Sequence, residues 1–186
     1  MKTNDNRGRL LQIAEESVQR TGLKSLSFRT LADEVGIKSS SVHYHFPEKS
    51  DLARTLIENY QDKLFVELNF IAASDAPLKS RFLAFVDVFS GAAEDNRICL
   101  LCMMASEFAA LNGQNQALLA SVFRNLENWL VQLFDSQSSQ LNTELTSQQV
   151  ARLAISGIEG ALLVDRVMHS TERLEAQKAS LLQLMQ

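Results

Sequence analysis

The segment from residue 27 to residue 46 constrains the fold of this chain more than any other. An apolar stripe predicts a first helix, because its members recur every three or four residues: Phe28, Leu31, Ala32 and Val35. Ser27 precedes the stripe and suits an N-cap, since its hydroxyl can accept a hydrogen bond from an unpaired backbone N–H. Gly36 follows it and suits the left-handed residue that ends a helix. A short helix with a defined start and stop is therefore predicted.

A second short helix is predicted directly after this turn, over residues 39–46. Val42 and Phe46 are four residues apart and point to one side, toward a small core. Serines and His43 occupy the other side, and Pro47 cannot extend the helix because it lacks an N–H group. Two short helices joined by a tight turn form a helix-turn-helix, whose second helix enters the DNA major groove. The segment thus predicts a DNA-binding protein.

The remainder of the chain is predicted to be helical almost throughout. A helix over residues 7–21 precedes the pair, so three helices form an N-terminal module. Further helices are predicted at about 48–72, 77–93, 97–111, 115–136, 147–169 and 172–185. Glycine and proline are scarce and no alternating β pattern occurs. We therefore predict an all-α fold of about nine helices, with a DNA-binding domain over 1–47 and a helical ligand-binding and dimerisation domain over 48–186.

Charge is distributed unevenly along the chain. Residues 1–50 hold eight Lys and Arg against six Asp and Glu, whereas residues 51–186 hold ten against sixteen. The net charge of −4 argues against a protein that coats DNA without selectivity. No apolar run is long enough to cross a membrane, the start of the chain has no apolar signal segment, and two cysteines suit a reducing compartment. We expect a cytoplasmic protein.

The N-terminal module resembles the DNA-binding domain of the TetR family of transcriptional regulators. The resemblance rests on residues 29–32 (Arg-Thr-Leu-Ala), 35–37 (Val-Gly-Ile), 41–42 (Ser-Val) and 44–52 (Tyr-His-Phe-Pro-Glu-Lys-Ser-Asp-Leu). The family usually has Tyr where this chain has His43, and often Gly or Pro near Ser40. The resemblance covers about 60 residues, and the rest of the chain matches the family in length and helical character.

This resemblance implies a homodimer that binds a palindromic double-stranded operator and acts as a repressor, released by a small-molecule effector. The implied DNA-binding residues are Ser27, Arg29, Thr30, Lys38, Ser39, Ser40, Ser41, His43, Tyr44, His45 and Lys49. Short hydroxyls, cations and helix N-termini typically position a protein on phosphates, while few side chains read bases.

The last two predicted helices are candidates for the dimer interface, as the family resemblance also implies. The proposed interface residues are Val150, Leu153, Ala154, Gly157, Ile158, Ala161, Leu162, Leu174 and Leu181. Small residues such as Gly157 allow a second helix to approach closely. The alternative is that this face belongs to the core of a single protomer.

The central helices are candidates for an effector pocket, whose existence the family resemblance implies. The candidate residues are Phe85, Phe89, Met103, Met104, Phe108, Phe123 and Trp129. A mostly apolar cavity with a few polar groups is the usual small-molecule site. The alternative is that these aromatic and Met side chains form ordinary core.

Cys99 and Cys102 form a Cys-Leu-Leu-Cys pair within an apolar segment. A zinc site is not expected, because no second cysteine pair accompanies them and the three histidines are distant in sequence. Some TetR-like regulators carry a sensing cysteine at the position of Cys99, so a thiol sensor is one interpretation and a pair of inert buried thiols is the other. A small helical thiol-redox protein or enzyme is the alternative function. No catalytic set, cofactor site or metal site is otherwise indicated.

Overall fold

A computed structural model describes residues 2–91 and 96–186 of the chain. The helices are α1 Lys2–Thr21, α2 Phe28–Val35, α3 Ser39–His45, α4 Lys49–Ala72, α5 Leu78–Ser90, α6 Leu100–Ser106, α7 Gly113–Ser136, α8 Ser147–Met168 and α9 Glu172–Leu182, with 3₁₀ turns at Phe108–Ala110 and Ser138–Gln140. Within the described residues, β pairing is limited to one isolated bridge between Leu141 and Met185. The all-α prediction is confirmed. None of the described helices combines the length and the apolar character needed to span a bilayer.

The chain forms two compact units that do not follow its linear order. The first unit comprises residues 1–62 and 97–120, and the second comprises residues 63–96 and 121–186. Helices α4 and α7 contribute residues to both units. The predicted division between residues 47 and 48 lies just before α4, inside the first unit.

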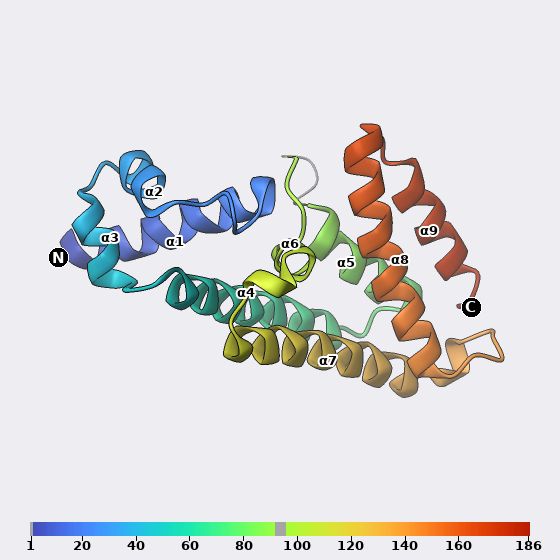
Figure 1. The fold of residues 1–186 in the computed structure, drawn as a ribbon. Helices are drawn as coiled ribbons and strands as arrows, with labels where there is room; N and C mark the ends of the chain where they lie inside the picture. The colour runs from blue at the N-terminus through green and yellow to red at the C-terminus, as the bar shows by residue number, and fades with distance from the viewer. Residues whose placement is uncertain (1, 92–95) are drawn as a thin grey trace. The chain divides into compact units, whose positions relative to one another are not determined.

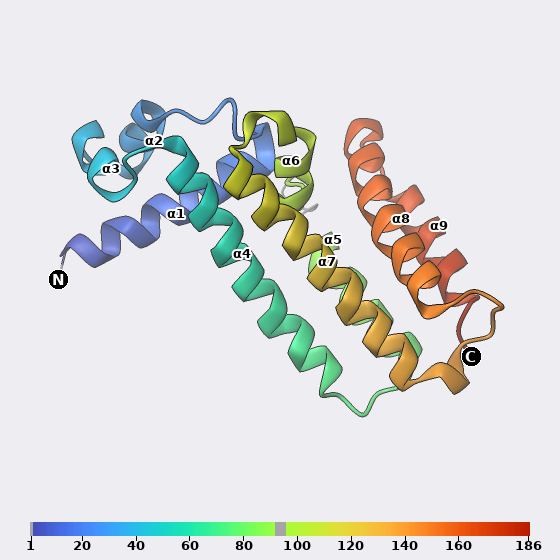
Figure 2. The same ribbon diagram turned by 60° about the horizontal axis from the view of Figure 1, so that its bottom comes forward.

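The first unit is built around the three N-terminal helices. Helix α2 contacts both α1 and α3, and Figure 2 shows α2 and α3 beside each other. The buried side chains that join these helices include Leu10, Ala14, Val18, Leu31, Val35, Val42 and Phe46. Helix α6 also contacts α1, and the Ile98 N–H donates to the carbonyl of Gln19 at 3.1 Å. Residues about 80 positions apart in sequence therefore complete the core of this unit.

The second unit places α5 against the pair formed by α8 and α9. Helices α8 and α9 lie side by side in both views, and α5 contacts each of them (Figure 1, Figure 2). Arg81 is buried and its guanidinium donates to the carbonyls of Ile71 and Ala72 at 3.2 and 2.7 Å. These carbonyls belong to the last turn of α4, where they have no partner within the helix. Arg81 thereby caps α4 from the neighbouring helix.

Several predicted helices differ in extent from those observed, and the helix predicted over 7–21 begins at Lys2. The helix predicted over 97–111 is α6 followed by a 3₁₀ turn, because Glu107 leaves helical geometry at φ −109° and ψ 23°. The helix predicted over 172–185 ends at Leu182, where the chain turns so that the Leu184 carbonyl accepts from the Asn142 N–H at 2.8 Å. Residues 92 and 93 of the helix predicted over 77–93 lie outside the described residues.

Candidate functional site

The turn between α2 and α3 is held by the caps that the sequence indicates. The Ser27 side chain accepts from the Thr30 N–H at 3.0 Å, which satisfies one of the unpaired donors at the start of α2. Gly36 has φ 76° and ψ 37°, a left-handed conformation that favours glycine. The N–H groups of Gly36 and Ile37 both donate to the Ala32 carbonyl at 2.9 Å. The chain therefore reverses sharply, and three residues separate the end of α2 from the start of α3.

Helix α3 has one anchored side and one exposed side. Val42 and Phe46 are buried, and the Phe46 N–H donates to the Val42 carbonyl at 2.8 Å. Ser39 and Ser40 are exposed, and 82% of the Tyr44 surface is accessible. The apolar side fixes α3 on the first unit. The polar side is exposed, as it is in a helix that enters a DNA groove.

His43 is positioned by contacts at its ring edge. Its ring lies 4.9 Å from the Phe28 ring in an edge-to-face arrangement, and its Nδ1 lies 3.5 Å from the Pro47 carbonyl oxygen. The remaining surface of His43 is exposed. The side chain is therefore held at the junction of α2, α3 and the following turn, at the position where the family usually has Tyr.

The predicted DNA-binding residues gather on the first unit. The exposed members are Ser27, Arg29, Thr30, Lys38, Ser39, Ser40, His43 and Tyr44, and the partly exposed members are Ser41, His45 and Lys49. We call this set the α2–α3 surface. Ser27 is already engaged as the cap of α2, and its hydroxyl lies 2.7 Å from that of Thr30. The surface offers cations, hydroxyls and an aromatic ring to a partner.

Lys49 is engaged within the protein. Its Nζ donates to the Lys24 carbonyl at 3.1 Å, in the connection between α1 and α2. Desolvation by burial lowers the pKa of the Lys49 ammonium, and the nearby carboxylate of Glu107 opposes that shift. Lys49 therefore supports the α1–α2 connection, a role that the sequence did not indicate.

Glu107 holds the same connection from the other side. Its Oε2 accepts from the Lys24 N–H at 2.9 Å. Gly22 has φ +88°, and a Cβ at that position would lie 2.7 Å from Oε1 of Glu107. The carboxylate thus packs against a backbone position that only glycine fits easily. The sequence offered no signal for this contact, because it joins residues 83 positions apart.

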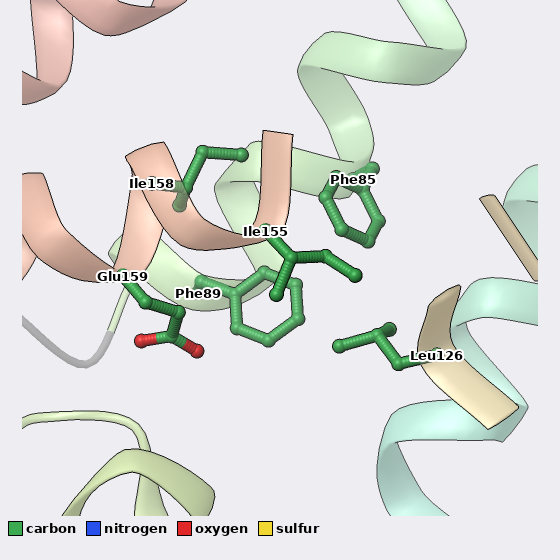
Figure 3. Close-up of a pocket in the computed structure, with 6 residues that line it drawn as sticks. All are labelled: Phe85, Phe89, Leu126, Ile155, Ile158 and Glu159. Atoms are coloured by element: carbon green, nitrogen blue, oxygen red, sulfur yellow. The ribbon is translucent and has the colours of Figure 1, made fainter. Parts of the chain in front are cut away.

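A small pocket in the second unit is lined by α5, α7 and α8 (Figure 3). Its lining residues are Phe85, Phe89, Leu126, Ile155, Ile158 and Glu159, and these side chains pack so closely that no space for a water molecule remains among them. The Phe85 and Phe89 ring centroids are 5.1 Å apart, and Trp129 stacks on Phe85 at 5.7 Å with an interplanar angle of 15°. The surface that lines the pocket is thus apolar, and it is formed mainly by aromatic and aliphatic side chains.

The structure brings together only some of the predicted pocket residues. Phe85 and Phe89 line the pocket and Trp129 supports it, while Phe123 is a half-buried residue of the second unit. Met103, Met104 and Phe108 belong to the first unit, and Phe108 is largely exposed. Ile155, Ile158 and Glu159 of α8 line the pocket but were not among the pocket predictions. The one feature of the sequence that could have indicated this burial is their position among the apolar residues of α8.

Helix α8 is apolar on two of its faces. Most of the predicted interface residues are buried within the protomer: Val150, Ala154, Ile158, Ala161, Leu162, Leu174 and Leu181. The Gln177 side chain packs over Gly157. Leu153 alone among the predicted residues is largely exposed. It belongs to a second stripe that we call the outer face of α8: Leu153, Gly160, Leu163, Val164, Val167 and Met168. On α8, the apolar residues available for contact with another chain are therefore those of the outer face.

The two cysteines differ in accessibility. Both are free thiols; Cys99 is buried and Cys102 is partly exposed. The Tyr60 hydroxyl donates to Sγ of Cys99 at 3.6 Å. Within the described residues no cluster of three or more His, Cys, Asp or Glu side chains is placed to hold a metal ion.

Comparison with known proteins points to one family. Residues 10–56 match the family model described as bacterial regulatory proteins, tetR family. Nucleoid occlusion factor SlmA from Marinomonas sp. is 26% identical over 132 residues, which are 71% of this chain and 67% of that protein. HTH-type transcriptional repressor KstR2 from Mycobacterium tuberculosis is 33% identical over 75 residues, 40% of this chain and 38% of that protein. A solved TetR transcriptional regulator from Legionella pneumophila has a TM-score of 0.90 and 28% identity, with 97% of each chain covered.

Proposed function

We propose that this chain, which belongs to the TetR family of DNA-binding transcriptional regulators, is a repressor that releases a palindromic operator when a small molecule binds. The observation that carries the proposal is the two-sided character of α3. Val42 and Phe46 anchor one side, and Ser39, Ser40 and Tyr44 are exposed on the other. The name of the relative KstR2 supports repression as the direction of control.

The α2–α3 surface supplies two kinds of DNA contact. The serine side chains of α3 are short, so their hydroxyls and the first backbone N–H groups of α3 would approach phosphates and base edges closely. Arg29 and Lys38 are exposed cations that reach farther, and an arginine can pair with guanine through two hydrogen bonds. Sequence preference would therefore come from these two residues and from DNA shape.

A dimer would double this small footprint. Val164 and Val167 are 45% and 75% exposed on the outer face of α8, and a Cβ at Gly160 would meet no atom within 4 Å. An exposed apolar stripe with a small residue at its centre suits close packing against a second copy of the same helix. Two recognition helices about one DNA turn apart would then match a palindromic operator in the cytoplasm.

Effector release is proposed to be a population shift. A ligand that binds among Phe85, Phe89 and Leu126 would have to open this closely packed space, and it would favour a conformation whose recognition helices no longer match the operator. The ligand can shift the equilibrium only by the difference in its affinity for the two conformations. Residues of α4 belong to both compact units, so this helix is the proposed carrier of the change.

The test is selection of bound fragments from the source genome, followed by fluorescence anisotropy with the selected operator at several salt concentrations. We expect log affinity to fall linearly with log salt, as phosphate contacts require. Arg29→Ala should weaken binding about tenfold, whereas Arg124→Ala, an exposed arginine of α7, should not. Failure to select any operator, or equal affinity of both variants, would contradict the proposal.

Thiol modification is a second candidate trigger for the same release. The contact between the Tyr60 hydroxyl and Cys99 Sγ favours it, because modification of the sulfur would break this hydrogen bond. Cys99 is buried, so a reagent would reach it through a transient local opening, whereas Cys102 is partly exposed. We expect N-ethylmaleimide to release the operator from wild type and not from Cys99→Ser. Release from that variant would assign the response to another residue, which Cys102→Ser would identify.

A further inference from the structure

An open groove runs between the C-terminal halves of α4 and α5, within the second unit. Its apolar lining consists of Val66, Phe70 and Ile71 of α4 and Ala84 and Val88 of α5. Its volume is about 540 Å³, so it has room for a partner without any rearrangement of the protein.

The α4 side of this groove exposes large apolar side chains to water. Val66 and Phe70 lie one helical turn apart, and 70% and 83% of their surfaces are accessible. Among the described residues, no large apolar side chain is more exposed than that of Phe70. Ala84 and Val88 also lie one turn apart and are half-buried, so they form the opposite side. Exposed apolar surface concentrated in a groove is typical of an interaction site.

The charged residues that line the groove are both acidic. Glu67 lies on α4 and Asp87 on α5, and both are exposed. The Lys178 ammonium lies 3.9 Å from the Asp87 carboxylate but 3.0 Å from that of Glu175, and 68% of the Asp87 side chain remains accessible. The complementary surface is therefore an apolar stripe that carries lysine or arginine on both sides.

The shape and the backbone of the groove favour a helix as the occupant. A small molecule in an open groove would stay largely in water, whereas typical small-molecule sites enclose most of their ligand. An extended peptide would find no strand edge to pair with, because α4 and α5 use their backbone groups within their own helices. A helix satisfies its own backbone groups and can lay an apolar face into a groove between two others.

We propose that the groove between α4 and α5 binds a basic amphipathic helix of another protein. The apolar face of that helix packs on Val66, Phe70 and Val88, and its lysine or arginine side chains pair with Glu67 and Asp87. This interaction goes beyond the proposed function, because it needs neither DNA nor an effector.

The experiment compares three synthetic peptides of about 18 residues, a length at which an isolated helix can form. The first has a leucine stripe at helical spacing flanked by lysine and arginine. The second has the same stripe flanked by glutamate, and the third has the composition of the first with its leucines spread around the helix. Fluorescence anisotropy of labelled peptide should show that the basic amphipathic peptide binds about tenfold more tightly than either of the others. Equal affinity for any two of these, or no binding of the first, would overturn the proposal, and this comparison needs no variant.

Variants then assign the binding to the groove. Phe70→Ser removes an exposed ring and should weaken the basic peptide at least fivefold, whereas Leu145→Ser, at an exposed leucine outside the helices, should not. The double change Glu67→Lys with Asp87→Lys should make the protein prefer the acidic peptide.

Glu144→Lys with Glu172→Lys makes the same change in net charge at exposed positions away from the lining and should keep the preference for the basic peptide. A preference that follows net charge in both double variants, or in neither, would contradict a site at this groove.

Light scattering separates the proposed partner from a second copy of this chain. Wild type and Phe70→Ser should have the same mass at every concentration, because the groove is proposed to hold another protein. Self-association that Phe70→Ser abolishes would assign the groove to a second copy and overturn the proposal. The peptide assays contain no DNA, so a failure to find an operator leaves their result unchanged.

Discussion

Replacement of Glu107 by alanine should loosen the connection between α1 and α2. The carboxylate accepts one hydrogen bond from the Lys24 N–H at 2.9 Å and faces the Lys49 ammonium. Hydrogen bonds to charged groups contribute roughly 1.5–3 kcal/mol. Glu107 is partly exposed, so we expect the lower part of this range, a loss of about 1–2 kcal/mol from the free energy of unfolding. In a chain of this length, each kcal/mol of lost stability lowers Tm by about 2–4 °C.

Urea denaturation followed by circular dichroism measures the global effect, and amide hydrogen exchange at Lys24 measures the local one. Glu107→Gln retains an acceptor oxygen and loses the charge, so it should lose less stability than Glu107→Ala. Glu144→Ala removes an exposed carboxylate outside the helices and serves as the control. If Glu107→Ala matched this control in stability and left exchange of the Lys24 amide unchanged, the carboxylate would not hold the connection as we argue.

Three further changes test other parts of the structure. Ser27→Ala removes the N-cap of α2 and should cost about 1 kcal/mol in thermal denaturation; an unchanged Tm would contradict the role of the cap. Burial by itself would raise the pKa of Asp165. The hydrogen bonds to its carboxylate, of which that from the Leu174 N–H is the strongest, outweigh burial, so the pKa lies below its usual value. The stability that Asp165 contributes should therefore be present above about pH 4 and lost as pH falls further, and Asp165→Asn should flatten the acid limb of a stability–pH curve. Val167→Asp should dissociate the proposed dimer in light scattering, whereas Val66→Asp, at a similarly exposed valine of α4, should not; the opposite pattern would move the proposed interface away from α8.

Features set by neighbouring residues could be predicted from the sequence. The N-cap of α2 depends on the Ser27 hydroxyl, and its C-cap depends on Gly36, which adopts a left-handed conformation easily because it has no side chain. The structure confirms that the helix begins and ends between these two residues. The exposed serines of α3 also follow from a local pattern, since Val42 and Phe46 define the opposite side.

Features set by distant residues could not be predicted in this way. The helix predicted through residue 111 ends at Ser106, and the next residue, Glu107, bonds to Lys24, which no local pattern reveals. Helix α8 carries apolar residues on two faces, and periodicity cannot show which face meets α9 of the same protomer. The position of Glu159 in the pocket likewise depends on how α5, α7 and α8 pack together.

At the start of α3, the residues that are exposed to a partner differ from the residues that hold the helix in place. Ser39 and Ser40 point away from the core, so their replacement would leave the packing of Val42 and Phe46 intact. Exchange of either serine for Arg or Asn would introduce a side chain able to make two hydrogen bonds to a single base. Under the proposed function, a lineage carrying this helix would be able to acquire new target sites by single codon changes while its thermal stability stays nearly constant.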